Sequence, residues 1–376
     1  MIILKFGGTS VSTKKSLEAI SKIVSKQKKN NPVVIVSALK GITDLLLSLS
    51  TSSTSNQITI LQKIKKVHIG LIQQFWLSEK EKNIHVSYIT EVIKNISSVL
   101  KTHRKLVLEF QDKIASYGEI MSSYIVCQVL RLNDISATQI IATELIVTND
   151  NFGNAKFCPV LTKKKVISKL KPLINKNIIP VITGFIGSTR DGKVTTLGRG
   201  SSDYSASIVG CCLGAKEIQI WTDVDGIYSA DPRIVKKAKI LKRISYKLAE
   251  VFANSGAKVL CPKTIKPAVE NKIPIRILNT FSPLSQGTSI ACNEKIIKQH
   301  ICGVMYKHLH GNQISVSIIG QNFKSKLFVQ EIRDFLSGLC KQKVYLRKSD
   351  NYSCLFLIES NNPVGIVNAL HNKYCA

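Results

Sequence analysis

Short apolar runs alternate with amphipathic stretches through most of the chain. Ile2–Phe6, Pro32–Ser37 and Ile178–Phe185 are short and apolar enough to be buried strands. Between them, apolar residues recur at helical spacing, for example from Ile58 to about Phe110. Strands that alternate with helices indicate an α/β sandwich, whose functional site lies along one edge of the sheet.

A second pattern begins near residue 300. The last part of the chain is predicted to form strands at Ile301–Lys307, Ile314–Ile319, Val344–Lys348 and Ser353–Glu359, with helices at Lys326–Leu339 and Pro363–Lys373. A chain of 376 residues exceeds what one small core usually holds. We therefore expect a large α/β domain over residues 1–290 and a small α+β module over residues 300–376.

The first strand ends in a glycine turn. Lys5 lies in this strand, and Gly7 and Gly8 lead from it into a helical pattern. A strand, a Gly-Gly turn and a helix start can bring backbone N–H groups close to phosphate oxygens, and Lys5 would add a compact positive charge. The turn is not a Walker loop, because the Gly-Lys-Ser/Thr ending of that motif is absent.

A second loop of small residues, Thr195–Tyr204, precedes a helix. Its glycines and serines leave backbone N–H groups uncovered at the helix N-terminus, which favours an anion. Arg199 adds a planar cation for a carboxylate or phosphate, and Asp203 adds a carboxylate that could orient a reacting group. The alternative is a tight turn with a solvated Arg199 and a capping Asp203.

Two further stretches carry candidate chemistry. The stretch Ser116–Glu119 interrupts the amphipathic pattern of a helix over about residues 112–130, and Glu119 could equally be a solvated helix acid. After the strand Glu217–Thr222, turn residues, Tyr228 and Arg233 follow in close succession. Such a mixture beyond a strand suits a nucleotide that is held by stacking and phosphate contacts.

Composition excludes several other classes of function. The net charge of +29 could indicate a polyanion partner, but the lysines are scattered and aromatic residues are only 6% of the chain, so we expect no nucleic acid. Ten cysteines without a CxxC pair suggest neither a zinc site nor a redox motif, and His308 and His310 are expected on the surface, so no metal site is predicted. No signal peptide or membrane span is evident, which favours a cytoplasmic protein.

Six motifs occur in an order that is similar to that of the aspartate kinases. They are Lys5–Val11, Ser37 with Gly41–Thr43, Thr196–Asp203, Trp221–Tyr228, Asp231–Arg233 and Gly256–Leu260. The resemblance covers about residues 1–290. It implies the amino-acid kinase fold, a three-layer α/β/α sandwich, with ATP and with Mg²⁺ held mainly through the nucleotide phosphates. It also implies phosphorylation of the side-chain carboxylate of L-aspartate to 4-phospho-L-aspartate, the first step toward lysine, threonine and methionine.

The resemblance also assigns roles to individual residues. Lys5 and Asp203 would be catalytic. Aspartate would be bound by Thr43, Glu119, Arg199 and Ser202. ATP would be bound by Lys5, Phe6, Gly7, Gly8, Thr222, Asp223, Tyr228, Arg233 and Lys258. Phosphoryl transfer depends on positioning and charge neutralisation, so these residue types suit that chemistry.

Two residues and the tail depart from the family pattern. Ser201 replaces a usual glycine, and Cys261 replaces a usual histidine. The tail has room for about one ACT-like module where relatives have two. We therefore expect a homodimer that pairs through this module, with weak or absent inhibition by lysine and threonine. The alternatives are a sibling kinase acting on glutamate, acetylglutamate or carbamate, and a non-catalytic regulatory homologue, in which loss of Lys5 or Asp203 would be expected.

Overall fold

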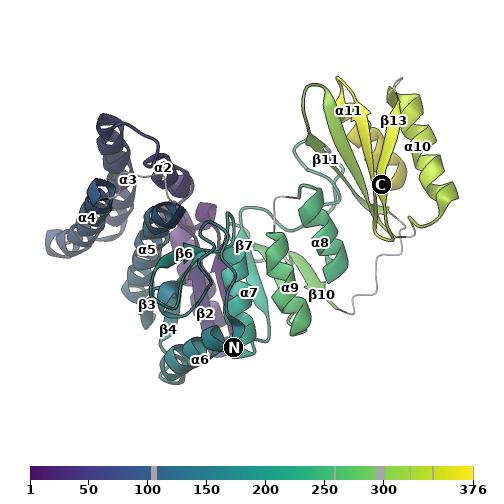
Figure 1. Cartoon of the computed structure of the whole chain (residues 1–376). Helices are drawn as coiled ribbons and strands as arrows, with labels where there is room; N and C mark the ends of the chain where they lie inside the picture. The colour runs from purple at the N-terminus through teal and green to yellow at the C-terminus, as the bar shows by residue number, and fades with distance from the viewer. Residues whose placement is uncertain (103–107, 258–259, 293–300, 322, 341–342, 376) are drawn as a thin grey trace. The chain divides into compact units, whose positions relative to one another are not determined.

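The structure is a computed structural model that describes residues 1–102, 108–257, 260–292, 301–321, 323–340 and 343–375. These residues form two compact units, drawn as ribbons in Figure 1. The first unit contains Met1–Asp223 and Asn279–Pro283, and the second contains Val224–Leu278 and Leu284–Ala376. Most of the expected linker between residues 290 and 300 lies outside the described residues, so the predicted domain boundary stays a prediction.

Within the described residues, the first unit contains a sheet of five parallel strands. β1 pairs with β2 on one side and β7 on the other, β2 pairs with β4, and β4 pairs with β3. The strands are β1 (Ile2–Phe6), β2 (Pro32–Val36), β3 (Ala137–Ile140), β4 (Ile179–Thr183) and β7 (Ile218–Thr222). β1, β2 and β4 are buried along their whole length, which explains their nearly continuous apolar sequence. Because the five strands are parallel, their carboxyl ends share one edge of the sheet.

Helices cover both faces of this sheet (Figure 1). α6 (Pro159–Asn175) and α7 (Ser202–Leu213) pack on one face, where α7 contacts β1, β2 and β7. α5 (Leu108–Leu132) packs on the other face against β2, β3 and β4, next to α1 (Lys14–Gln27). The predicted α/β/α sandwich is therefore confirmed. The other elements of the unit are α2 (Ile42–Ser48), α3 (Thr54–Phe75), α4 (Glu79–Thr102), the hairpin strands β5 (Ile186–Ser188) and β6 (Val194–Thr196), and the 3₁₀ turns η1 (Gly8–Val11), η2 (Lys28–Asn30) and η3 (Ala142–Glu144).

The second unit begins with a short mixed strand arrangement. β10 pairs antiparallel with β9 and parallel with β8, and α8 packs against α9 and against β8 and β10. The bounds of these elements are β8 (Arg243–Ser245), α8 (Tyr246–Ser255), α9 (Pro262–Glu270), β9 (Ile275–Asn279) and β10 (Thr288–Ala291).

Residues 301–375 form what we call the C-terminal module. Its antiparallel sheet has the strand order β11-β12-β14-β13, and α11 contacts β11 while α10 contacts β13 and β14. The bounds are β11 (Ile301–His308), β12 (Gln313–Gly320), α10 (Lys326–Cys340), β13 (Val344–Ser349), β14 (Ser353–Glu359) and α11 (Pro363–Tyr374). Every predicted strand and helix of this tail is present in the expected order. The predicted small α+β module is thus confirmed.

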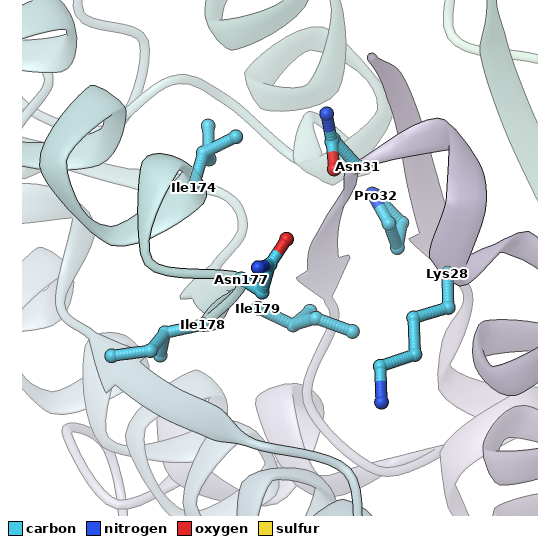
Figure 2. Close-up of a pocket in the computed structure, with 7 residues that line it drawn as sticks. All are labelled: Lys28, Asn31, Pro32, Ile174, Asn177, Ile178 and Ile179. Atoms are coloured by element: carbon cyan, nitrogen blue, oxygen red, sulfur yellow. The ribbon is translucent and has the colours of Figure 1, made fainter.

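A small cavity lies at the edge of the first unit's sheet where β2 and β4 begin (Figure 2). Its volume is about 20 Å³, enough for about one water molecule. Lys28, Asn31 and Asn177 line it together with apolar side chains. Ligands of parallel α/β sheets bind at the opposite edge, where strands end. The functional site is therefore sought at the carboxyl ends.

Protonation of His68, which is fully buried in α3, should make the first unit sensitive to acid. Its Nδ1 donates to the Ile64 carbonyl at 2.7 Å, and burial lowers its pKa from 6.5 to about 4. The neutral ring thus stabilises the fold above about pH 6.5, and this contribution of about 3 kcal/mol is lost as the pH falls toward 4. Urea unfolding followed by Trp76 and Trp221 fluorescence, at pH 7 and 4.5, measures the difference.

We expect His68→Leu to reduce this difference in unfolding free energy, whereas the same substitution of the exposed His310 should leave it unchanged. An unaltered pH dependence in the His68 variant would contradict the assignment.

Candidate active site

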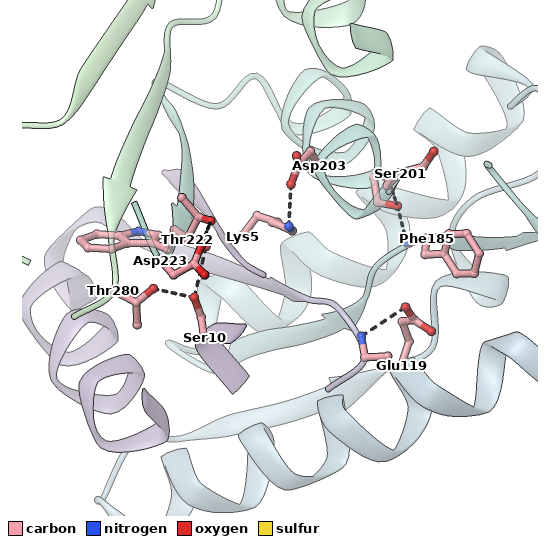
Figure 3. A network of polar contacts seen from close by, with 12 residues as sticks. Lys5, Ser10, Glu119, Phe185, Ser201, Asp203, Thr222, Asp223 and Thr280 are labelled. Atoms are coloured by element: carbon pink, nitrogen blue, oxygen red, sulfur yellow. Dashed lines mark hydrogen bonds and ion pairs between the residues drawn. The ribbon is translucent and has the colours of Figure 1, made fainter. Parts of the chain in front are cut away.

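An ion pair between Lys5 and Asp203 lies at the carboxyl edge of the first unit's sheet (Figure 3). Lys5 Nζ is 2.6 Å from Asp203 Oδ1, and each side chain is only 10% exposed. Lys5 is held by β1, and Asp203 is the second residue of α7, where the helix dipole favours a carboxylate. β1 and α7 thus bring together opposite charges from residues that are far apart in the sequence.

The glycine turn after β1 lies close to the neighbouring strand ends. The N–H of Gly7 donates to the Trp221 carbonyl at 3.0 Å. A Cβ atom at Gly8 would come within 2.9 Å of the Ala38 carbonyl oxygen, so only glycine fits there. Phe6 is fully buried and stacks on Trp221, with ring centroids 6.1 Å apart. The backbone of Phe6 could contact a nucleotide, but its buried ring could not.

The predicted anion loop precedes α7 as expected. Gly198 and Gly200 have φ of 101° and 73°, which are left-handed values that favour glycine. Ser201 instead has a φ of −84°, and its hydroxyl donates to the Leu197 carbonyl at 2.9 Å. The serine that departs from the family pattern therefore fits without backbone strain. Ser202, the first residue of α7, is buried.

Arg199 projects from this loop into solvent. Its Nη1 is 3.8 Å from Asp44 Oδ1, and both side chains are more than three-quarters exposed. Asp44 follows Thr43 in the first turn of α2, and Thr43 is half-buried. The structure thus brings Arg199 close to the helix start that carries Thr43. Such an exposed pair is weak, which leaves the guanidinium able to exchange Asp44 for another anion.

Glu119 is not a solvated helix acid, so that alternative is wrong. α5 continues without a break through Ser116–Glu119, and Glu119 is 3% exposed. Its Oε1 accepts from the Ala38 N–H at 3.2 Å, while its buried Oε2 has no hydrogen-bond partner among the described residues. Burial raises the pKa of Glu119 to about 8, against opposing contributions from the Ala38 hydrogen bond and the charge of Lys5. The orphaned oxygen is ready to accept from a cationic donor.

Asp112 was not predicted as a site residue, yet it fixes the approach to the anion loop. Its Oδ2 accepts from the N–H groups of Gly153 and Thr196, both at 2.8 Å, and its Oδ1 accepts from the Thr196 hydroxyl at 2.6 Å. Thr196 ends β6 directly before the loop. A helix acid facing a hairpin more than eighty residues away leaves no local signal in the sequence.

The predicted ATP residues fall into two groups. Thr222 and Asp223 follow β7 in the first unit, where the Thr222 hydroxyl donates to Asp223 at 3.2 Å. The Thr222 carbonyl also accepts from the N–H of Thr280, whose hydroxyl lies 2.7 Å from that of Ser10. Figure 3 shows this hydroxyl pair beside the strand ends. Sequence reasoning missed both Ser10 and Thr280.

Tyr228 and Arg233 belong to the second unit. The Tyr228 hydroxyl donates to Asp225 at 3.2 Å, and Arg233 donates through two nitrogens to Asp231. The side chain of Arg233 is 82% exposed. Lys258, the last predicted ATP residue, lies outside the described residues. Its role stays a prediction.

Other potential ligand groups do not assemble a metal centre within the described residues, where no cluster of three or more His, Cys, Asp or Glu side chains occurs. His308 and His310 are exposed, as predicted. In the same part of the chain, no helix combines the length and the apolarity that a membrane span needs.

Comparison with known proteins decides the family. The sequence model of the amino acid kinase family matches residues 1–279. The chain belongs to the amino acid kinase family. Its matched region contains Lys5, Asp203 and the other predicted site residues.

Several proteins that are similar to this chain are aspartokinases. The chain is 32% identical to aspartokinase 1, chloroplastic, of Arabidopsis thaliana over 81% of its own length and 54% of that protein. It is 33% identical to lysine-sensitive aspartokinase 3 of Escherichia coli over 78% of its length and 64% of the relative. An aspartokinase of Rickettsia felis is 31% identical over 86% of this chain and 69% of that protein. The chain thus spans about half to two thirds of the length of these relatives, and the resemblance to aspartate kinases is confirmed.

The fold has a counterpart among solved structures. E. coli aspartokinase III in complex with aspartate and ADP superposes with a TM-score of 0.89, covering 99% of both chains at 23% identity. At this identity the likeness shows the shared fold.

Replacement of Asp112 by asparagine should destabilise the loop before α7. An asparagine side chain has one carbonyl oxygen, so it cannot accept all three hydrogen bonds that Asp112 accepts. We expect Asp112→Asn to lower the unfolding free energy by about 1–3 kcal/mol, the penalty for buried donors left without acceptors. Urea unfolding followed by tryptophan fluorescence measures it, and the exposed Asp150→Asn is the control. Equal stability of the two variants would show that Asp112 does not hold the loop.

Proposed function

We propose that this protein is an aspartate kinase that uses ATP to phosphorylate the side-chain carboxylate of L-aspartate, giving 4-phospho-L-aspartate and ADP. The observation that carries the proposal is the Lys5–Asp203 pair at the N-terminus of α7, beside the glycine turn of β1. The names of the relatives support the same activity, as does the E. coli structure that holds aspartate and ADP. This activity is the first step toward lysine, threonine and methionine.

The reaction needs little proton chemistry. At neutral pH the side-chain carboxylate of aspartate is ionised, so its oxygen can attack the γ-phosphorus of ATP without a general base. A new oxygen–phosphorus bond forms while the bond to the β–γ bridging oxygen breaks, and the electron pair leaves with ADP. Lys5 would neutralise charge on the transferred group, and Asp203 would hold Lys5 in place.

Aspartate has one ammonium and two carboxylates, and the predicted substrate residues provide complementary groups. Glu119 offers a buried carboxyl oxygen without a partner among the described residues, which suits the ammonium. Arg199 offers an exposed guanidinium for the α-carboxylate. Thr43 and Ser202 would add hydroxyl donors. In this arrangement the side-chain carboxylate would point toward Lys5.

ATP would be bound by the strand ends and by the segment that follows them. Gly7, Gly8 and the Phe6 backbone would approach the phosphates, and Thr222 and Asp223 would contact the nucleotide from β7. Tyr228, Arg233 and Lys258 would complete its binding. Mg²⁺ would be held mainly by phosphate oxygens, since the described residues contain no ready-made acidic cluster, and Asp203 is the buried carboxylate at the phosphoryl end. The ion would supply charge neutralisation between the phosphates.

The test is turnover of Mg-ATP with separate acceptors. ADP release should depend on L-aspartate, and hydroxylamine should trap the acyl phosphate product as a hydroxamate. L-glutamate, acetylglutamate and carbamate represent the sibling kinases of this fold. Preference for one of these would assign the chain to a sibling activity, and no turnover with any acceptor would favour a non-catalytic regulatory protein. Retention of Lys5 and Asp203 favours a catalyst.

Removal of either charge of the central pair should abolish most activity. Lys5→Ala and Asp203→Ala should each lower kcat by at least about a hundredfold, the scale of losing a preorganised charge at a transition state. Lys193→Ala breaks a surface ion pair with Glu109 and is the matched control. Steady-state kinetics on the folded variants measures this loss of kcat. A near-native kcat in either variant would refute the catalytic role of that residue.

Aspartate binding should improve as the pH rises. The pKa of Glu119 is about 8, so below that pH the carboxyl is protonated and must lose its proton to pair with an ammonium. The KM for aspartate should fall by roughly tenfold for each pH unit up to the pKa of Glu119. Glu119→Gln should have a raised KM that no longer varies over this range. A KM in the wild-type protein that is independent of pH would contradict this role.

The C-terminal module also offers a surface for a second copy, and we infer a homodimer that pairs there. In the described part of the module, β13 pairs only with β14, so its outer edge is open, and it exposes Tyr345 and Leu346. An open edge strand with apolar side chains favours pairing with an identical edge. Weak or absent inhibition by lysine and threonine stays a prediction, as does a cytoplasmic location.

Light scattering should give twice the mass of one chain, and Leu346→Lys should give a monomer. Leu284→Lys, at an exposed position of the same unit outside the module, should remain dimeric. A monomeric wild-type protein, or a dimeric Leu346 variant, would exclude this interface.

A further inference from the structure

The segment Tyr228–Arg233 is anchored to the C-terminal module through Ser229. The Ser229 carbonyl accepts from the Val304 N–H of β11 at 2.8 Å. Its hydroxyl lies 2.8 Å from His371 Nε2 on α11 and accepts from the Lys239 N–H at 2.9 Å. Ser229 is 3% exposed and His371 is fully buried. One residue after Tyr228, the chain is therefore bonded to both a strand and a helix of the module.

The far end of the segment is anchored in the same way. Asn368 of α11 donates from Nδ2 to the Ile234 carbonyl at 3.0 Å, one residue after Arg233. Ala230 and Val235 are buried in the core of the module, together with residues of its sheet and helices. α11 thus contacts the segment at both ends, while the side chain of Arg233 stays exposed.

Histidine at position 371 is less favourable for stability than an apolar residue that would only fill the same space. Its Nδ1 is buried without a hydrogen-bond partner among the described residues, and burial, with Lys239 and Lys237 nearby, lowers its pKa. A buried polar atom without a partner is destabilising, so leucine or methionine would fill the same volume more favourably. What the imidazole adds over an apolar side chain is the hydrogen bond between Nε2 and the Ser229 hydroxyl.

We propose that His371 is a positioning residue for ATP, which acts by fixing Ser229 and thereby the adjacent Tyr228 and nearby Arg233. The inference rests on the proposed function, because it takes these two side chains as nucleotide ligands. It gives the module a role in catalysis that requires no amino-acid effector. The segment between β7 and α8 would hold its nucleotide-binding form because α11 and β11 hold its backbone.

The experiment compares asparagine and glutamine at position 371, whose terminal amides lie at different distances from the backbone. The terminal amide of glutamine can take the place of Nε2, whereas that of asparagine takes the place of Nδ1. His371→Asn should therefore lose the bond to Ser229, and His371→Gln should keep it. His310→Asn, an exposed histidine of the same module, is the matched control.

We expect His371→Asn to raise the KM and the dissociation constant for Mg-ATP by roughly fivefold, the scale of one neutral hydrogen bond. kcat and the KM for aspartate should change little, and His371→Gln should recover most of the ATP affinity. A purely structural role would instead lower the melting temperature and the active fraction without separating ATP from aspartate. Unchanged ATP affinity in His371→Asn, or no recovery in His371→Gln, would overturn the proposal.

Ser229→Ala covers the case in which His371→Asn does not fold. It removes the hydroxyl from the same bond and should weaken Mg-ATP by a similar factor; native affinity in this variant would equally overturn the proposal. Calorimetric measurement of ATP binding distinguishes a failure of the proposed function from a failure of the role proposed for His371. A wild-type protein that binds ATP but does not phosphorylate aspartate would refute the proposed function, while the comparison of variants would still decide the role of His371.

Discussion

Lys5 and Asp203 hold opposite charges 2.6 Å apart where little of either side chain reaches solvent. Neither charge would be tolerated there alone, because desolvating an ion without a partner is strongly unfavourable. β1 and α7 must therefore meet in one register, with the first turn of α7 directed at the end of β1. The glycine turn, the anion loop and Glu119 are arranged around this constraint, since Gly8 lies against Ala38 and Ala38 is bonded to Glu119.

Much of this could be predicted from sequence because the signals are local. Apolar runs mark β1, β2 and β4, glycines mark the two loops, and the alternation of strands and helices marks the fold class. The tail was predictable for the same reason, since each of its strands and helices has its own period. Lys5 and Asp203 were identifiable as candidates because each lies beside a glycine-containing loop.

The sequence could not reveal the burial, the pKa or the long-range hydrogen bonds of individual side chains. Glu119 has the same sequence signature whether it is solvated or buried, and only the packing of α5 against the sheet raises its pKa to about 8. Asp112, Ser10 and Thr280 act across long sequence separations. Likewise, nothing near Ser229 in the sequence indicates that His371, more than a hundred residues later, completes its hydrogen bonds. These contacts depend on topology and not on periodicity.

An experimental structure of the protein with L-aspartate and a non-hydrolysable Mg-ATP analogue tests most directly whether phosphoryl transfer takes place at the Lys5–Asp203 pair. We predict that Lys5 Nζ contacts the terminal phosphate, that Glu119 accepts from the aspartate ammonium and that Arg199 leaves Asp44 for the α-carboxylate. The side-chain carboxylate should then face the terminal phosphorus. Aspartate bound away from Glu119, or a terminal phosphate out of reach of Lys5, would contradict it.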